Sequence, residues 1–139
     1  MEKLLSESFV QKSVIEYLFR KGWSRNLRSK TEKEHGVDIK VRHNRYARYW
    51  LIEIKGERHL ESNFYHALGQ IISRMKTKRK KGYKYGYKYG VGFPASFRNK
   101  VIKNLPYDVC DKLNLYVFLG DKLGKIELLD WKKIKKLQN

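Results

Sequence analysis

Apolar and polar residues follow two different periods along this chain, and each period predicts one type of element. From about Leu4 to Lys21 the apolar residues recur at helical spacing, which predicts an amphipathic helix. Its apolar stripe consists of Leu4, Val10, Val14, Ile15, Leu18 and Phe19. Gly22 supplies the C-terminal stop. The segment 23–30 that follows is a candidate strand, and 31–36 is predicted to be a polar loop.

Two runs with strict alternation come next and predict a pair of strands. A hairpin centred between Arg45 and Tyr46 brings every apolar residue of the two runs onto one face. The apolar pairs are Val37 with Ile54, Ile39 with Ile52, and Val41 with Trp50. Because a shift of one residue would move this whole set to the opposite face, the pattern favours a single register.

The remaining pattern predicts a mixed α/β domain that covers residues 1–139. A second helix is expected over 61–80, with the stripe Phe64, Ala67, Leu68, Ile71 and Met75. Strand spacing follows over 85–93 and ends before Pro94. A helix over 95–105, strands over 115–119 and 125–129, and a short basic helix in the tail complete the chain.

The charge of the chain narrows the class of partner. Lysine and arginine number 32 against 14 aspartate and glutamate residues, which gives a formal net charge of +18. Such an excess is typical of proteins that bind polyphosphates, and we expect DNA as the partner. A membrane surface is a weaker candidate, because no stretch combines a basic face with a lipid-facing stripe.

The densest basic segment lies at the end of the second predicted helix and is the leading candidate for DNA contact. Its members are Arg74, Lys76, Lys78, Arg79, Lys80 and Lys81. Tyr85, Tyr87 and Tyr89 follow it and have two interpretations. They could stack on unpaired bases, or they could form the inner face of a core strand, which their alternation favours.

The sequence also bears on cellular location. Cys110 is the single cysteine, so an intramolecular disulfide is excluded, and one thiol is compatible with a reducing compartment. The N-terminal residues MEKLLSESFVQKS lack the apolar core of a signal peptide. No apolar run approaches the ~20 residues that span a bilayer. We therefore expect a cytoplasmic protein.

The predicted hairpin also creates a candidate site for chemistry. Its register sets Asp38 opposite Glu53, and Lys55 emerges on the same face about 7 Å further along. Carboxylate oxygens suit Mg²⁺ or Mn²⁺, and the chain has too few Cys and His residues for a zinc site. Such a metal could activate water against a phosphodiester while the lysine stabilises charge. The same residues also fit a surface hairpin with a cross-strand ion pair worth under ~1 kcal/mol.

Two polar residues of the first predicted helix strengthen the first interpretation. Glu7 and Gln11 fall in the middle of the apolar stripe. Burying a polar group there without a partner costs roughly 1–3 kcal/mol, so polar partners are expected inside. Glu7 could instead remain hydrated in a frayed first turn, whereas Gln11 lies too far into the helix for that explanation.

These residues together resemble the PD-(D/E)xK nuclease superfamily. The matching pattern is Val37-Asp38, a gap of fourteen residues, and then Glu53-Ile54-Lys55, within an order of elements that matches over residues 7–93. The segment Ala67-Leu68-Gly69-Gln70, followed by a strand that ends in Gly-Phe-Pro, is similar to Mrr-like and archaeal Holliday-junction-resolvase-like members. One departure is Gly36-Val37, which replaces the proline that names the motif.

The resemblance implies a fold and a role for each site residue. It implies a restriction-endonuclease-like core of order αβββαβ, with a mixed sheet flanked by helices. Asp38, Glu53 and the Ile54 carbonyl would bind the metal, and Lys55 would be the catalytic lysine. Gln11, or Glu7 as the alternative, would be the active-site residue of the first helix. Gln70 matches the glutamine of the second helix, although its place off the apolar stripe equally fits a solvated side chain.

The sequence therefore predicts an Mg²⁺-dependent DNA endonuclease that leaves a 5′-phosphate. A basic nucleic-acid-binding protein with a purely structural acidic cluster is the alternative from another class. A junction-resolving enzyme that recognises branched DNA by shape is a third hypothesis, and it implies a homodimer. The chain contains no helix-turn-helix or zinc finger that would read a base sequence.

Overall fold

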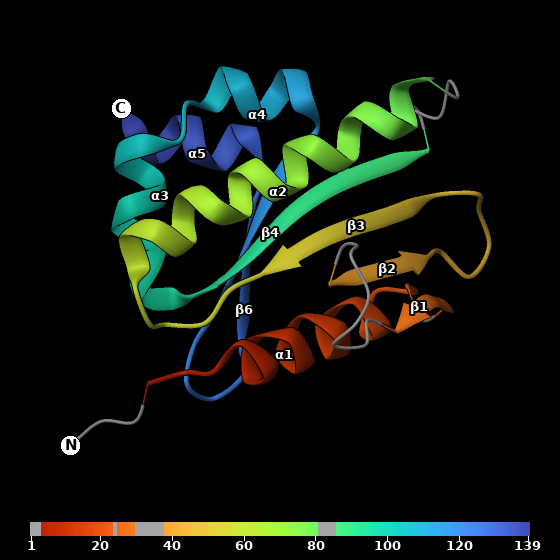
Figure 1. Ribbon diagram of the computed structural model, residues 1–139, viewed down its shortest axis with the longest axis horizontal. Helices are drawn as coiled ribbons and strands as arrows, with labels where there is room; N and C mark the ends of the chain where they lie inside the picture. Colours follow the sequence, from red (N-terminus) through yellow and green to blue (C-terminus); the bar gives the residue numbers. More distant parts are fainter. Residues whose placement is uncertain (1–3, 24, 30–37, 81–85) are drawn as a thin grey trace.

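A mixed β-sheet forms the middle of the protein (Figure 1). The computed structural model describes residues 4–23, 25–29, 38–80 and 86–139. The sheet has six strands in the order of the sequence. They are β1 (Arg25–Ser29), β2 (Ile39–Arg42), β3 (Tyr49–Ile54), β4 (Tyr87–Pro94), β5 (Leu115–Gly120) and β6 (Ile126–Leu129). Strands β3, β4 and β5 are parallel, and the other neighbouring pairs are antiparallel.

Helices cover both faces of this sheet (Figure 1). Helix α1 (Glu7–Arg20) packs on one face, where its buried residues join those of β2 and β3. The other face is covered by α2 (Leu60–Lys80), the 3₁₀ turn η2 (Ala95–Phe97), α3 (Arg98–Asn104), α4 (Tyr107–Leu113) and α5 (Trp131–Gln138). The first six elements have the order αβββαβ of the restriction-endonuclease-like core predicted from the sequence. Among the described helices, none is long and apolar enough to cross a membrane.

Helix α1 begins and ends where the sequence indicates. The Ser6 side chain accepts a hydrogen bond from the Phe9 backbone N–H at 3.1 Å and caps the first turn. Gly22 follows the last turn with a φ of +91°, a conformation that favours glycine. The predicted apolar stripe was too wide, because Leu4 is 57% exposed and Phe19 is 65% exposed. Phe19 lies about 100° around the helix from the buried Leu18 and points to solvent.

The predicted hairpin register is confirmed over the described residues. Ile39 pairs with Ile52 and Val41 with Trp50, while Val37 and the loop at 31–36 lie outside the described residues. Strand β4 also follows its predicted alternation, since Tyr87 and Tyr89 are buried in the core under α2. This burial confirms that these tyrosines are core residues and are not available for base stacking; Tyr85 is not among the described residues.

The C-terminal elements were predicted except for α4. This helix has only seven residues and follows Pro106, so it carries little periodic signal. It ends at Asn114, whose φ of 55° is left-handed and whose amide donates to the Tyr87 carbonyl at 2.8 Å. Burial raises the pKa of the Cys110 thiol in this helix to about 12, which is consistent with a structural cysteine.

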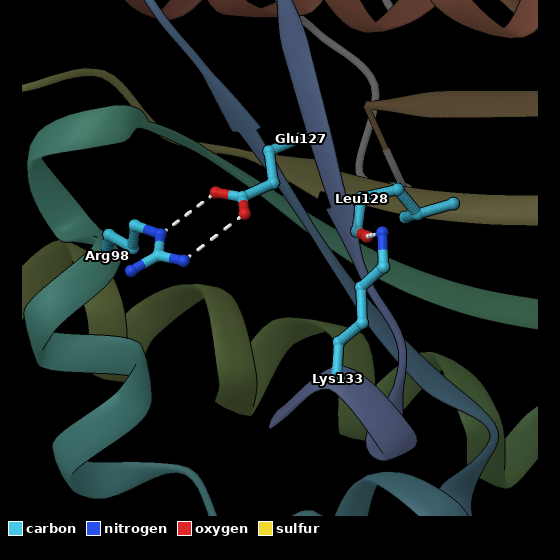
Figure 2. Close-up of polar contacts among 4 residues, drawn as sticks. All are labelled: Arg98, Glu127, Leu128 and Lys133. Atoms are coloured by element: carbon cyan, nitrogen blue, oxygen red, sulfur yellow. Dashed lines mark hydrogen bonds and ion pairs between the residues drawn. The ribbon is translucent and has the colours of Figure 1, made fainter. Parts of the chain in front are cut away.

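Two side-chain contacts tie the outer strand β6 to the helices next to it (Figure 2). Arg98 at the start of α3 donates from Nε and Nη2 to the two carboxylate oxygens of Glu127, at 3.0 and 3.3 Å. Lys133 of α5 donates from Nζ to the Leu128 carbonyl at 3.2 Å. Because the Arg98–Glu127 pair is exposed, we expect it to contribute less than about 1 kcal/mol.

Candidate functional site

The hairpin of β2 and β3 places two buried carboxylates at one end of the sheet. Asp38 directly precedes β2, and Glu53 is the penultimate residue of β3. Extending the observed pairing of Ile39 with Ile52 by one residue sets Asp38 across from Glu53. Their relative exposures are only 6% and 1%. Removing a carboxylate from water costs on the order of several kcal/mol, so compensating groups must lie close to both.

Asp38 is fixed from two sides. Its Oδ2 atom accepts a hydrogen bond from the Ile54 backbone N–H at 2.7 Å. Its backbone carbonyl accepts a hydrogen bond from Gln11 Nε2 of α1 at 3.3 Å. The prediction that Gln11 has a polar partner inside the protein is thus confirmed. The partner is the peptide group of Asp38, and Gln11 therefore holds the start of β2.

Glu53 lies under α2, on the face of the sheet away from α1. The Arg74 Nε atom lies 3.8 Å from Glu53 Oε1, and the Arg74 side chain is 34% exposed. Arg74 therefore offsets the charge of a buried carboxylate, a role that differs from its predicted place among the DNA contacts. The sequence could not indicate this pair, because it depends on how α2 is rotated on the sheet.

Gln70 lies one helical turn before Arg74 on the same side of α2. Its Oε1 atom is buried and has no hydrogen-bond partner among the described residues. A buried amide oxygen without a partner costs about 1–3 kcal/mol. This burial argues against the plain solvated glutamine that the sequence left open.

Lys55 and Glu7 line one cleft at the end of β3. The cleft has a volume of about 630 Å³, and Ser6, Glu57, Arg58 and Asn63 also line it. The backbone N–H of Lys55 donates to the Gly92 carbonyl at 3.0 Å, which holds the chain against β4 as it leaves the sheet. The structure therefore places the predicted catalytic lysine and Glu7 in the wall of one cleft. Gln11 instead donates to the Asp38 carbonyl.

The wall of this cleft depends on a close contact between two backbone segments. The backbone N–H of Glu57 donates to the Leu5 carbonyl at 2.9 Å, and the Leu5 N–H donates to Glu57 Oε1 at 2.8 Å. A Cβ atom on Gly56 would lie 2.7 Å from the Glu7 backbone nitrogen. The sequence alone does not indicate a role for Glu57, because that role depends on Leu5, about fifty residues earlier in the chain.

Replacing Gly56 by alanine is expected to lower the free energy of unfolding by about 1–3 kcal/mol, because the new methyl group meets backbone that cannot rotate away. Urea unfolding monitored by circular dichroism would measure this change. Gly69→Ala in α2 is the matched control, since its Cβ would meet nothing within 4 Å. The control is expected to gain up to about 1 kcal/mol from helix propensity, and equal losses in both variants would contradict the close contact.

The oxygen donors of the site suit a hard divalent cation. Asp38 and Glu53 supply carboxylates at the end of the hairpin, and Ile54 follows Glu53 with a backbone carbonyl. Mg²⁺ is usually held by one or two carboxylates and keeps several waters, so this small set is sufficient. Within the described ranges, no group of three or more His, Cys, Asp and Glu side chains is placed to hold a metal. The residues that could hold such an ion are thus Asp38, Glu53 and the Ile54 carbonyl, and its binding stays a prediction.

The predicted DNA-binding segment is described only in its backbone. Helix α2 continues to Lys80, but the side chains of Lys76, Lys78, Arg79 and Lys80 and all of Lys81 lie outside the described residues. Their contact with DNA stays a prediction. In Figure 1 this end of α2 lies at the same end of the molecule as the turn between β2 and β3.

Comparison with known proteins supports the fold. No protein-family model matches the chain, and no curated protein matches it in sequence. Among solved structures, the chain is similar to an XisH family protein from Nostoc punctiforme PCC 73102, with a TM-score of 0.61 and 17% sequence identity. The match covers 88% of this chain and 99% of that chain. At this identity the likeness shows that the two chains share an α/β fold over almost the whole of the Nostoc protein.

Proposed function

We propose that the protein is an Mg²⁺-dependent endonuclease that hydrolyses phosphodiester bonds of DNA. The observation that carries this proposal is the burial of Asp38 and Glu53 at one end of the hairpin, with Lys55 two residues further and lining an open cleft. Carboxylates buried beside an open cleft are typical of functional sites. The net charge of +18 supports a polyanionic substrate.

Each site residue has a distinct task in this proposal. Asp38, Glu53 and the Ile54 carbonyl would hold Mg²⁺, which would polarise the phosphate and lower the pKa of a bound water. The Lys55 ammonium stabilises negative charge as the phosphate oxygens gain it during attack. Gln11 and the Ile54 N–H keep Asp38 in position. Water adds to phosphorus and the bond to the 3′ oxygen breaks, which leaves a 3′-hydroxyl and a 5′-phosphate.

The proposal is tested with wild type and Glu53→Gln on plasmid, linear duplex, single-stranded and four-way-junction DNA. Each substrate is incubated with Mg²⁺, with Mn²⁺ and with chelator. We expect wild type to cut with either metal and to be inactive in chelator, and Glu53→Gln to be inactive throughout. Cutting restricted to four-way junctions would identify a junction-resolving enzyme, for which a dimer in solution is expected.

The Glu53–Arg74 contact favours one second candidate, a basic nucleic-acid-binding protein whose acidic cluster is structural. Thermal unfolding separates the two functions, because a metal that binds the native state raises Tm. For a nuclease, Mg²⁺ raises the Tm of wild type but not that of Glu53→Gln. For the binding protein, Mg²⁺ changes neither Tm, and DNA binds without being cut under any condition.

A further inference from the structure

The turn between β2 and β3 carries an exposed tyrosine on an ordered stack of rings. Tyr46 is 61% exposed, and its ring stacks on His43 with centroids 5.1 Å apart and planes at 29°. His43 meets the edge of Trp23 at 4.9 Å, and Trp23 contacts the buried Trp50 at 6.1 Å. A chain of aromatic contacts therefore connects the surface ring to the core, so that Tyr46 presents a supported face.

Backbone hydrogen bonds fix the turn that carries this ring. The His43 N–H donates to the Arg48 carbonyl at 2.9 Å, and the Arg48 N–H donates to the Tyr46 carbonyl at 2.8 Å. The Asn44 N–H donates to the Gly22 carbonyl at 2.9 Å, which anchors the turn to the end of α1. The Arg45 N–H donates to His43 Nδ1 at 3.1 Å. The ring is thus held in place before any ligand binds, which lowers the entropic cost of binding.

Positive charge surrounds the same rings. Between Asp38 and Glu53 the sequence contains Lys40, Arg42, Arg45 and Arg48 and no aspartate or glutamate. Arg45 and Arg48 are exposed. Basic side chains next to an exposed aromatic face are the combination with which proteins hold single-stranded nucleic acid, because the cations contact phosphates and the ring stacks on a base.

Lys88 of β4 adds a further cation behind this turn. Its ammonium lies over the rings of Trp23, Trp50 and Tyr116, at 5.9, 5.5 and 5.3 Å from their centroids. Burial, and then the positive charge of Arg48, lowers the pKa of Lys88. An anion bound at the turn would therefore be attracted by Lys88 as well as by the arginines of the turn.

The turn lies at the opposite end of the hairpin from the buried carboxylates. Strand β3 separates them, and at about 3.3 Å per residue it is roughly 17 Å long. The Tyr49 N–H donates to the Gly86 carbonyl at 2.7 Å, which brings the start of β4 beside the turn. The basic end of α2 lies at this same end of the molecule (Figure 1). A nucleic acid strand bound here therefore lies within a few nucleotides of the candidate active site.

We propose that residues 43–48 form a stacking platform for an unpaired base of single-stranded nucleic acid, with Tyr46 against the base and Arg45 against a neighbouring phosphate. This inference rests on the proposed function in one respect only, which is that the partner is a nucleic acid. It adds that the substrate contains unpaired nucleotides. It also adds a contact surface apart from the basic end of α2.

The test measures binding of fluorescent oligo(dT) and of a duplex of equal length by anisotropy, in chelator so that no cleavage occurs. Tyr46→Ala is expected to weaken oligo(dT) binding about tenfold, with the salt dependence unchanged, and to leave duplex binding within about twofold. Tyr46→Phe is expected to bind like wild type, because it keeps the ring. Arg45→Gln is expected to reduce the slope of log affinity against log salt by about 0.7, the value for one phosphate contact on a single strand.

Tyr65→Ala is the matched control, because Tyr65 is a tyrosine of α2 that is 51% exposed. This substitution is expected to change neither the affinity for oligo(dT) nor the affinity for the duplex. Oligo(dT) affinity that is equal in Tyr46→Ala and wild type would overturn the platform, as would an equal loss for oligo(dT) and duplex. The result is independent of the nuclease proposal. Tyr46-dependent binding without cutting by wild type would refute the nuclease alone, and cutting with Tyr46-independent binding would refute the platform alone.

Discussion

Replacing Lys55 by alanine is expected to reduce the rate of metal-dependent DNA cleavage by at least about 100-fold. Lys55 lines the cleft at the end of β3, immediately after the Glu53-Ile54 pair that would hold the metal. The measurement is the initial rate of plasmid cleavage at saturating Mg²⁺, with the variant and wild type at equal concentration.

Two controls make the Lys55 result specific. Lys103→Ala removes an exposed lysine of α3, and it is expected to cut at the rate of wild type. DNA affinity of Lys55→Ala measured in chelator is expected to stay within a few-fold of wild type, because one phosphate contact is a small part of the electrostatic binding of so basic a chain. Cleavage by Lys55→Ala at the rate of wild type would show that the active site lies elsewhere.

Replacing Phe118 by alanine is expected to lower the free energy of unfolding by about 3–5 kcal/mol. Phe118 is fully buried under α1, where its ring packs against Trp50 at 5.0 Å and Tyr17 at 6.2 Å. Truncation leaves a cavity between α1 and the sheet that rigid strands on both sides prevent from closing. Guanidinium unfolding followed by tryptophan fluorescence would measure the loss, since Trp50 is a direct neighbour.

Phe19→Ala is the matched control for Phe118→Ala. The sequence pattern assigns Phe19 to the apolar stripe of the first helix, whereas the structure leaves it 65% exposed. We therefore expect this substitution to change the free energy of unfolding by no more than about 0.5 kcal/mol. A loss in Phe19→Ala comparable to that in Phe118→Ala would mean that α1 is rotated on the sheet, and Gln11 would then be displaced from Asp38.

The hairpin shows how far local pattern can lead. Alternation with a period of two leaves one register in which all apolar residues share a face, and the pairs Ile39–Ile52 and Val41–Trp50 obey it. That register alone placed Asp38 and Glu53 at the same end of the hairpin, and both are buried there. The stripe of α2 and the tyrosines of β4 were predicted for the same reason, because each position depends only on neighbours along the chain.

Other parts of the site depend on contacts between distant segments. The rotation of α2 on the sheet decides that Arg74 contacts Glu53 and that Gln70 Oε1 is buried. The rotation of α1 decides that Gln11 donates to the Asp38 carbonyl. A run of basic residues indicates charge, but it does not indicate which member turns inward to offset a carboxylate.

The sequence by itself therefore determined the type and order of most elements, the hairpin register and the basic character of the chain. The tertiary structure decided which helix face is buried, since Phe19 is exposed, and it decided which residues surround the carboxylates. It also assembled Trp23, His43 and Tyr46 from two segments into one stack. The physical reason is that periodicity is a property of neighbouring residues, whereas the contacts of a site depend on the packing of whole helices and strands against one another.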